Sequence, residues 1–144
     1  IVVSRFIEDR ALACGAGELH STFQRLSRLD DEYGTRKLYA WLGDSDVDTH
    51  VYGVRDDPDA VDGLGVTVHD GTTHEYRRSW VVVFDPAPDT AEADAVAAPR
   101  DPDSDPCSPV ALVAIEVDDN VWRSMWTYDP ERVDRIRTYV RREF

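Results

Sequence analysis

Four histidines are the side chains of this sequence best suited to metal or acid–base chemistry. His50, His69 and His74 fall in or beside segments with strand character, where they could meet on neighbouring strands with His20 nearby. A metal site needs ligands that converge and that further hydrogen bonds hold in place. These histidines stand singly along the chain. We therefore expect surface or half-buried side chains, with no bound metal and no other cofactor.

Enzymatic chemistry has little support in the sequence. His20 could act as a base toward Cys14 or an aspartate, in a pairing that activates a nucleophile. No strained turn marks either residue as such a nucleophile. The GLGV stretch that begins at Gly63 does not lead into a helix, as a phosphate-binding loop does. We expect a protein that is not an enzyme.

Tryptophan and arginine give a better case for a bound ligand. Trp122 and Trp126 lie an even number of residues apart on one expected strand, so they share a face. Ligand pockets are mostly apolar with a few polar groups, and arginine can orient an acidic ligand. The alternative is that these aromatic residues are ordinary core. The candidate ligand-binding residues are His20, Gln24, Arg78, Trp80, Trp122, Arg123, Trp126 and Tyr128.

The charge of the chain is strongly biased toward acid. Its formal net charge is -13, and Lys37 is its single lysine among 16 basic residues. Acidic surfaces suit high salt, where screening weakens self-repulsion. This composition predicts a salt-loving, archaeal type of host and argues against direct binding of nucleic acid. No apolar run reaches the length of a membrane span, and no secretory segment is evident. We therefore expect a cytoplasmic location with no membrane partner.

The first half of the chain must position the histidines. Apolar spacing predicts a helix over residues 1–14 with Ser4 as its N-cap, ended by Gly15 or Gly17. Alternation predicts a strand over residues 18–24, with His20, Thr22 and Gln24 on one side. The elements expected next are a helix over 26–42 interrupted near Gly34, and strands over 47–54 and 65–69.

The second half of the chain carries the clearest patterns. Residues 76–85 predict a central strand, and Asp70-Gly71 before it predicts a hairpin turn. Residues 110–117 and 121–128 predict an antiparallel pair. Asp129 and Pro130 then begin a helix with good capping chemistry. Its buried stripe is expected to be Val133, Ile136, Val140 and Phe144, while its arginines pair with nearby acids or form a docking face.

These elements predict one domain over residues 1–144. Its fold class is α/β, with α+β as the alternative: a single mixed sheet of five to six strands flanked by helices. The segment 86–109 holds six of the eight prolines and is expected to be an exposed loop. Cys14 and Cys107 lie far apart in a chain without a secretory signal, so we expect free thiols.

Three stretches together resemble a known family. They are SRFIEDRALACGAGELHSTFQRLSRL near the start, RSWVVVFD in the middle, and ALVAIEV followed by WTYDPERVDRI near the end. Their order and spacing, over residues 4–140, are similar to the DICT sensory domain, which occurs with diguanylate cyclases and two-component systems. The loop over 86–109 departs from the compact pattern of that family.

The resemblance implies a noncatalytic sensory or regulatory module. Such a domain would act on an attached or associated output module, such as a histidine kinase or a helix-turn-helix regulator. The sequence begins without Met, and we expect a fragment of a longer protein. A small-molecule ligand and a homodimer are both compatible with the resemblance. The alternative function is an interaction or dimerisation module without a ligand.

Overall fold

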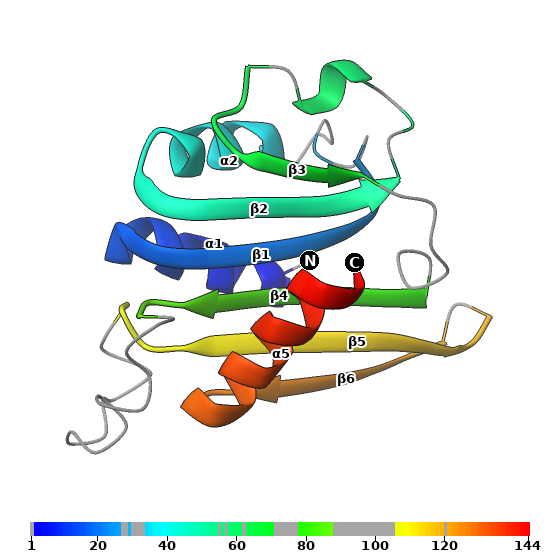
Figure 1. Ribbon diagram of the computed structural model, residues 1–144. Helices are drawn as coiled ribbons and strands as arrows, with labels where there is room; N and C mark the ends of the chain where they lie inside the picture. Colours follow the sequence, from blue (N-terminus) through cyan, green and yellow to red (C-terminus); the bar gives the residue numbers. More distant parts are fainter. Residues whose placement is uncertain are drawn as a thin grey trace.

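One six-stranded sheet organises the computed structural model of this chain (Figure 1). The structure describes residues 2–26, 29, 34–54, 56, 58–61, 63–70, 78–87, 106–119 and 121–144, without the side chains of residues 2, 3, 24, 58 and 60. The strand order is β3-β2-β1-β4-β5-β6. Helices α1 and α2 cover one face and α5 crosses the other (Figure 1). The α/β class and the single mixed sheet that the sequence predicts are thus confirmed.

The elements follow one another as predicted, with two differences: the helix predicted over 26–42 is seen as α2 from Thr35, since most of residues 27–33 lie outside the described residues, and the short helix η2 was not predicted. Parallel pairs join β1 to β2 and β2 to β3, and antiparallel pairs join β1 to β4, β4 to β5 and β5 to β6. The bounds are α1 Val2–Cys14, β1 Ala16–Arg25, α2 Thr35–Gly43, β2 Asp46–Val54, the short 3-10 helix η2 Pro58–Val61, β3 Thr67–Asp70, β4 Ser79–Asp85, β5 Val110–Asp118, β6 Val121–Thr127 and α5 Pro130–Glu143.

Two local predictions about α1 have different outcomes. Gly15 has φ 77°, a conformation that suits glycine, and it ends the helix as predicted. Ser4 is not the N-cap, because the helix begins at Val2 and Ser4 is buried within it. The apolar residues before Ser4 continue the helix instead of leading into it.

The predicted hairpin after β3 is wrong. β3 pairs with β2 in parallel, whereas β4 pairs with β1 and β5. The two strands are therefore separated in the sheet by β2 and β1. Asp70-Gly71 is good turn chemistry, but a turn signal does not determine which neighbour the following strand takes. Residues 71–77, which join the two strands, lie outside the described residues.

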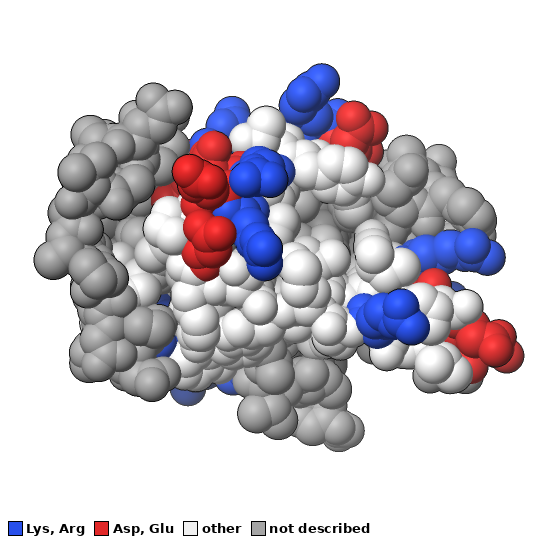
Figure 2. Space-filling view, turned by 90° about the horizontal axis from the view of Figure 1, so that it is seen from below, with Lys and Arg blue, Asp and Glu red and all other residues white. Residues whose placement is uncertain are grey.

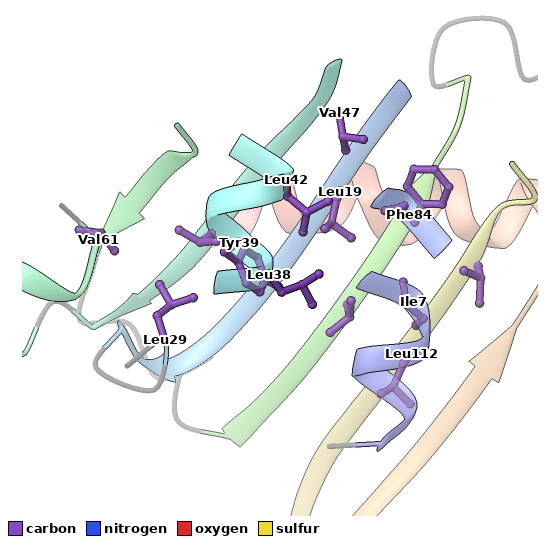
Figure 3. Packing of buried hydrophobic residues seen from close by; sticks show 14 of the residues in the cluster. Ile7, Leu19, Leu29, Leu38, Tyr39, Leu42, Val47, Val61, Phe84 and Leu112 are labelled. Atoms are coloured by element: carbon purple, nitrogen blue, oxygen red, sulfur yellow. The ribbon is translucent and has the colours of Figure 1, made fainter. Parts of the chain in front are cut away.

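The face under α1 and α2 carries the larger apolar core (Figure 3). On each strand every second side chain points into this core, as in Leu19 of β1, Val51 of β2 and Phe84 of β4. Ile7 of α1 and Leu42 of α2 cover them, and all five are fully buried. At about 25 cal/mol per Å², such burial is the main stabilising contribution of this layer.

Helix α5 covers the middle of the opposite face and packs against β4 and β5. Asp129 is its N-cap, and the Asp129 carboxylate accepts a hydrogen bond from the Glu131 N–H, with Pro130 in the first turn, as predicted. Val133 and Val140 are fully buried against the sheet, while Ile136 and Phe144 are half-buried. The predicted stripe is confirmed, but a charged residue, Arg137, is buried beside it.

Strand β6 stands at one edge of the sheet. Figure 2 views the molecule from this side and shows uncharged residues over the middle of the surface, with acidic and basic side chains around them. Large apolar side chains near this edge are exposed, among them Ile115 and Val117 of β5 and Val121 and Met125 of β6. No helix among the described residues is long and apolar enough to cross a membrane.

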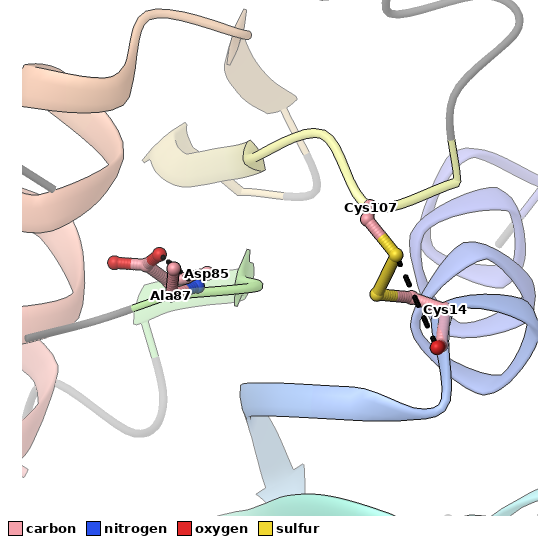
Figure 4. Close-up of a disulfide and its surroundings, with 4 residues drawn as sticks. All are labelled: Cys14, Asp85, Ala87 and Cys107. Carbon is pink, nitrogen blue, oxygen red and sulfur yellow. Dashed lines mark hydrogen bonds between the residues drawn. A yellow bond between two sulfur atoms is a disulfide. The ribbon is translucent and has the colours of Figure 1, made fainter. Parts of the chain in front are cut away.

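Cys14 and Cys107 form a disulfide, so the prediction of free thiols is wrong (Figure 4). Cys14 ends α1 and Cys107 precedes β5, and the fold brings their Cα atoms to 4.9 Å, within the range that a disulfide spans. Sγ of Cys107 also lies 3.9 Å from the Cys14 carbonyl oxygen, a contact without a donated proton. Sequence analysis could not reveal this proximity, because the two cysteines lie 93 residues apart in the chain.

Candidate functional site: two regions beside helix α5

A polar cluster of six side chains lies on the α5 face of β1, β2 and β3. Alternation on each strand and the parallel register place its members together. We call it the histidine cluster, and its members are Glu18, His20, Asp48, His50, Tyr52 and His69. His20, His50 and His69 thus meet on neighbouring strands; the prediction of surface or half-buried side chains holds for His50 and His69, but is wrong for His20, which is fully buried. His74 lies outside the described residues.

Two carboxylates, those of Glu18 and Asp48, each contact one histidine of the cluster, and further hydrogen bonds connect the rings. Nε2 of His20 lies 2.8 Å from Oε1 of Glu18, and Nδ1 of the same ring lies 2.8 Å from the Tyr52 hydroxyl. Nε2 of His50 lies 3.0 Å from Oδ2 of Asp48, and its Nδ1 lies 3.0 Å from Nε2 of His69. Each of the two carboxylates therefore orients one imidazole.

The rings of the histidine cluster are also stacked. The centroids of His20 and His50 are 4.6 Å apart, with 10° between the ring planes. Tyr52 and His69 are 4.3 Å apart, with 9° between their planes. Neighbouring strands lie about 4.8 Å apart, so rings on adjacent strands stack when they adopt similar rotamers. This stacking and the hydrogen bonds restrain the ring orientations together.

Arg137 of α5 connects the helix to the histidine cluster. Its guanidinium lies 3.4 Å from a carboxylate oxygen of Glu18, 3.4 Å from Asp85 and 2.8 Å from Asp134. Arg141, one turn further along, lies 3.9 Å from Oε1 of Glu18. The prediction that the arginines of this helix pair with nearby acids is confirmed for Arg137 and Asp134, but the link to β1 and β4 was not predicted.

Burial shifts the ionisation of this region. Burial lowers the pKa of His20 to about 4, although the Glu18 carboxylate favours the charged ring. Burial also lowers the pKa of His69, with the nearby His50 and Arg141 acting in the same direction. His20 is therefore a neutral imidazole at pH 7, the form that can accept a proton or bind a metal ion.

The ion pairs of Arg137 and burial have opposite effects on the pKa values of Arg137 and Asp85. Burial raises the pKa of Asp85, while the Ala87 N–H and the Arg137 charge lower it. Burial disfavours the charged form of Arg137, but the Asp134 hydrogen bond and the charges of Glu18, Asp134 and Asp85 raise its pKa overall. Arg137 therefore stays cationic and holds Glu18 and Asp85 close to α5.

An apolar hollow of about 500 Å³ lies on the other side of α5. Strands β4, β5 and β6 form its floor and α5 forms one wall. Arg78 and Arg135 are the two cations of a mostly apolar lining, and Arg135 also lies 3.7 Å from a carboxylate oxygen of Glu131. The hollow is lined by Arg78, Ser79, Val81, Val113, Ile115, Met125, Arg135, Ile136, Tyr139 and Phe144. Phe144 also contacts Tyr52 edge to face at 6.4 Å between ring centroids, so the hollow and the histidine cluster meet there.

The aromatic candidates lie away from the hollow. Trp122 and Trp126 share a face of β6 as predicted, but this is the face toward α1, where Trp126 stacks on Phe6 with 5.6 Å between ring centroids. Trp80 and Tyr128 pack against the core on the same side. Trp80, Trp126 and Tyr128 therefore match the alternative interpretation, in which they are ordinary core.

The polar candidates are divided between regions. His20 belongs to the histidine cluster, and Arg78 lines the hollow. Arg123 is exposed and is not among the residues that line the hollow. Gln24 lies on β1, but its side chain is outside the described residues. The structure therefore does not bring the eight candidates into one site.

Sequence reasoning missed Glu18, Asp48, Tyr52 and Arg137. The alternation that placed His20, Thr22 and Gln24 on one side of β1 also places Glu18 there. The same alternation on β2 aligns Asp48, His50 and Tyr52. The missing information was the parallel register of β1 and β2, which pairs His20 with His50.

No protein-family model matches the sequence, and no curated protein matches it.

Proposed function

We propose that this chain is a noncatalytic sensory domain that binds a small molecule in the apolar hollow beside α5. One observation carries the proposal: the hollow combines an apolar floor with two arginines, Arg78 and Arg135. Its volume of about 500 Å³ is in the range of small-ligand sites. The resemblance of the sequence to the DICT sensory domain supports the same class of function.

The two arginines determine the kind of ligand. The protein carries a formal net charge of -13, so its overall field repels anions. Two guanidinium groups beside the hollow counter that field locally and can bind a carboxylate or phosphate in two-point geometry. The side chains of Val113, Ile136 and Tyr139 favour an apolar body. The ligand we propose is a small amphipathic acid.

Helix α5 is the element that would report ligand binding. It supplies one wall of the hollow, and Arg137 ties it to β1 and β4. A ligand shifts a conformational equilibrium only as far as it binds one state better than another. Contacts to α5 supply such a difference. In this proposal the helix passes the signal to an attached or associated output module, such as a histidine kinase or helix-turn-helix regulator.

The proposal places the domain in the cytoplasm of a salt-loving cell. The Cys14–Cys107 disulfide weighs against this location, because such bonds are rare in reducing compartments. Cell fractionation followed by immunoblotting tests the proposal. We expect the protein in the cytoplasmic fraction, and recovery from the medium or from a membrane fraction would contradict the location.

A ligand screen by thermal unfolding tests binding in the hollow. Purified protein in high-salt buffer is scanned against fatty acids, aromatic carboxylates and phosphorylated metabolites. A ligand that binds only the native state must raise the unfolding temperature. We expect a subset of amphipathic acids to do so. The replacements Arg78→Gln and Arg135→Gln should each weaken their binding about tenfold, as expected for loss of one charge-assisted hydrogen bond.

Two replacements on the same strand provide the matched control. Met125 points into the hollow, whereas Ser124 points to the opposite face of β6. Met125→Trp should fill the hollow and abolish the thermal response, while Ser124→Trp should leave it intact. A screen without any stabilising acid, or a response that Met125→Trp leaves unchanged, would overturn the proposal.

The exposed apolar edge favours a second candidate function, dimerisation through β6. Val117 and Val121 are exposed at the turn between β5 and β6, and Ile115 and Met125 continue this surface toward the hollow. An exposed edge strand can pair with a second copy. Sedimentation velocity over a range of concentrations separates the two cases. Self-association that Val121→Glu abolishes would support the dimer, and a monomer at every concentration would exclude it.

A further inference from the structure

The histidine cluster contains a set of side chains with the chemistry of a transition-metal site. Glu18, His20 and His50 each offer one ligand atom, and these three atoms lie within 4.8 Å of one another. Two imidazoles and one carboxylate form a ligand set found in zinc sites with an open fourth position. We propose that Glu18, His20 and His50 bind a divalent transition-metal ion of the zinc class.

Metal binding requires the His50 ring to turn out of its stack with His20, because imidazole lone pairs lie in the ring plane and the two ring planes are only 10° apart. In a tetrahedral zinc site with bonds near 2.0–2.1 Å, ligand atoms are about 3.3 Å apart. The closest pair, Nε2 of His20 and Oε1 of Glu18, starts at 2.8 Å and would have to open slightly. The widest separation in the set would have to close by roughly 1.5 Å, which side-chain rotation supplies. His50 is the adaptable member, because its side chain is 16% exposed whereas that of His20 is fully buried.

The surroundings provide the outer shell that metal ligands need. Nδ1 of His20 faces the Tyr52 hydroxyl, and Oε2 of Glu18 faces Arg137, so both ligands are held from behind. Asp48 lies 3.0 Å from Nε2 of His50 and can orient that ring in the same way. His69, whose Nε2 lies 3.0 Å from Nδ1 of His50, stands next to the set.

Proton positions can adjust without a charged intermediate. In the hydrogen bonds as they stand, Nε2 of His20 donates to the Glu18 carboxylate and Nδ1 accepts from the Tyr52 hydroxyl. Coordination through Nε2 places the single ring proton on Nδ1, which then donates a hydrogen bond to the Tyr52 oxygen, and the Tyr52 hydroxyl turns its own proton away. The ring carries one proton before and after coordination, so the change of tautomer is balanced.

The same chemistry sets the type of ion. Imidazole nitrogen suits zinc, copper, iron and nickel, whereas calcium and magnesium prefer shells made of oxygen. An approach to the cluster exists along β2, where the Asp48 side chain is 60% exposed. Two cations oppose the ion: buried Arg137, which lies 3.4 Å from Oε2 of Glu18, and Arg141, whose guanidinium lies 3.9 Å from Oε1 of Glu18. The Arg141 side chain is 54% exposed and can move toward solvent.

Zinc binding to the purified full chain tests the proposal without any organic ligand. Tag-free protein is treated with a chelator, transferred to high-salt buffer and titrated with Zn²⁺ in competition with a chromophoric chelator. We expect one zinc ion per chain. Glu18→Gln and His50→Gln should each weaken binding at least about tenfold, since even outer-shell changes cost that much. Circular dichroism of each variant verifies that it is folded, and His50→Gln is safer for folding than a change at His20, because the His50 side chain is partly exposed and that of His20 is fully buried.

Two charge controls separate a built site from general attraction to an acidic protein. Asp46→Asn removes a carboxylate from an exposed position on β2 and should leave zinc affinity within about twofold, as charges near the surface interact weakly. Arg141→Gln should tighten binding because it removes the opposing cation, whereas Arg142→Gln, with the same change of charge, should not. The proposal is overturned if no stoichiometric zinc binding occurs, or if Glu18→Gln and His50→Gln bind like wild type. It is equally overturned if Asp46→Asn weakens binding as much as they do.

Discussion

The two faces of the sheet are built in different ways. Under α1 and α2, apolar side chains from both helices and four strands form a closed layer. On the other face, the single helix α5 covers the middle and leaves a polar cluster on one side and an apolar hollow on the other. The difference indicates that the first face stabilises the domain, while the second has the shape and the polar groups for binding.

The largest expected effect is the loss of stability when the disulfide beside the closed face is removed. Cys14–Cys107 ties the end of α1, on the closed face, to the start of β5 across 93 residues of sequence. In the chain-entropy model a loop of this size is worth about 4–5 kcal/mol. We expect reduction, or the Cys14→Ser and Cys107→Ser double replacement, to lower the free energy of unfolding by about that amount. Urea denaturation with and without reductant measures it, and equal midpoints would show that the closed face does not depend on this link.

Truncation of one side chain on each face gives the next largest effect. Leu42 of α2 is fully buried in the closed layer, whereas Ile136 of α5 is half-buried beside the hollow. Leu42→Ala should cost about 3 kcal/mol, in the usual range for buried leucines. Ile136→Ala should cost about 1 kcal/mol because less apolar surface returns to water. The comparison would fail if denaturant titrations gave the two variants equal losses.

A buried carboxyl makes the closed face sensitive to pH. Burial raises the pKa of Glu8 in α1 to about 7, while Arg5, Tyr39 and Ser4 partly offset it. The folded state therefore holds a proton that the unfolded chain releases above its ordinary value of 4.5. Stability from this group is full below pH 4.5 and is lost as pH rises to about 7, by about 3 kcal/mol in all.

Glu8→Gln should remove that loss. Its free energy of unfolding should exceed that of wild type at pH 8 by an amount that shrinks as pH falls toward 4.5. Urea titrations of both proteins at a series of pH values measure this difference. Parallel pH profiles for wild type and Glu8→Gln would contradict the buried position of this carboxyl.

The smallest effect concerns the arginines that line the hollow. Arg78 and Arg135 lie at or near the protein surface, so Arg78→Gln and Arg135→Gln should each change stability by less than about 0.5 kcal/mol. Thermal unfolding without ligand measures this. A large loss would mean that these arginines support the fold and are not held for a ligand.

The sequence predicted the elements well, because each depends on local spacing. Alternation identified β1, β2 and β6, continuous apolar runs identified β4 and β5, and Asp129-Pro130 identified the start of α5. The closed face could be predicted from these patterns, because Leu19 and Leu42 lie on the apolar sides of their strand and helix, and apolar sides pack into the core. Residues 88–105, most of the predicted exposed loop, lie outside the described residues.

The candidate site could not be predicted in the same way, because it depends on which strands pair. Glu18 and His50 are 32 positions apart, and they meet only because β1 and β2 are parallel and in one register. Cys14 and Cys107 meet for a similar reason. The tryptophans were assigned correctly to one face of β6, but alternation alone does not determine which face a helix leaves open.

The most direct test of the central claim, that the α5 face carries two separate binding regions, is an NMR titration of isotope-labelled wild-type protein with Zn²⁺. The account predicts saturation at one equivalent, with large shifts at the imidazole nitrogens of His20 and His50 and at neighbouring amides of β1 and β2. Amides of Val113 and Met125, on the floor of the hollow, should barely move. Shifts spread over the acidic surface, or no change at His20 and His50, would contradict it.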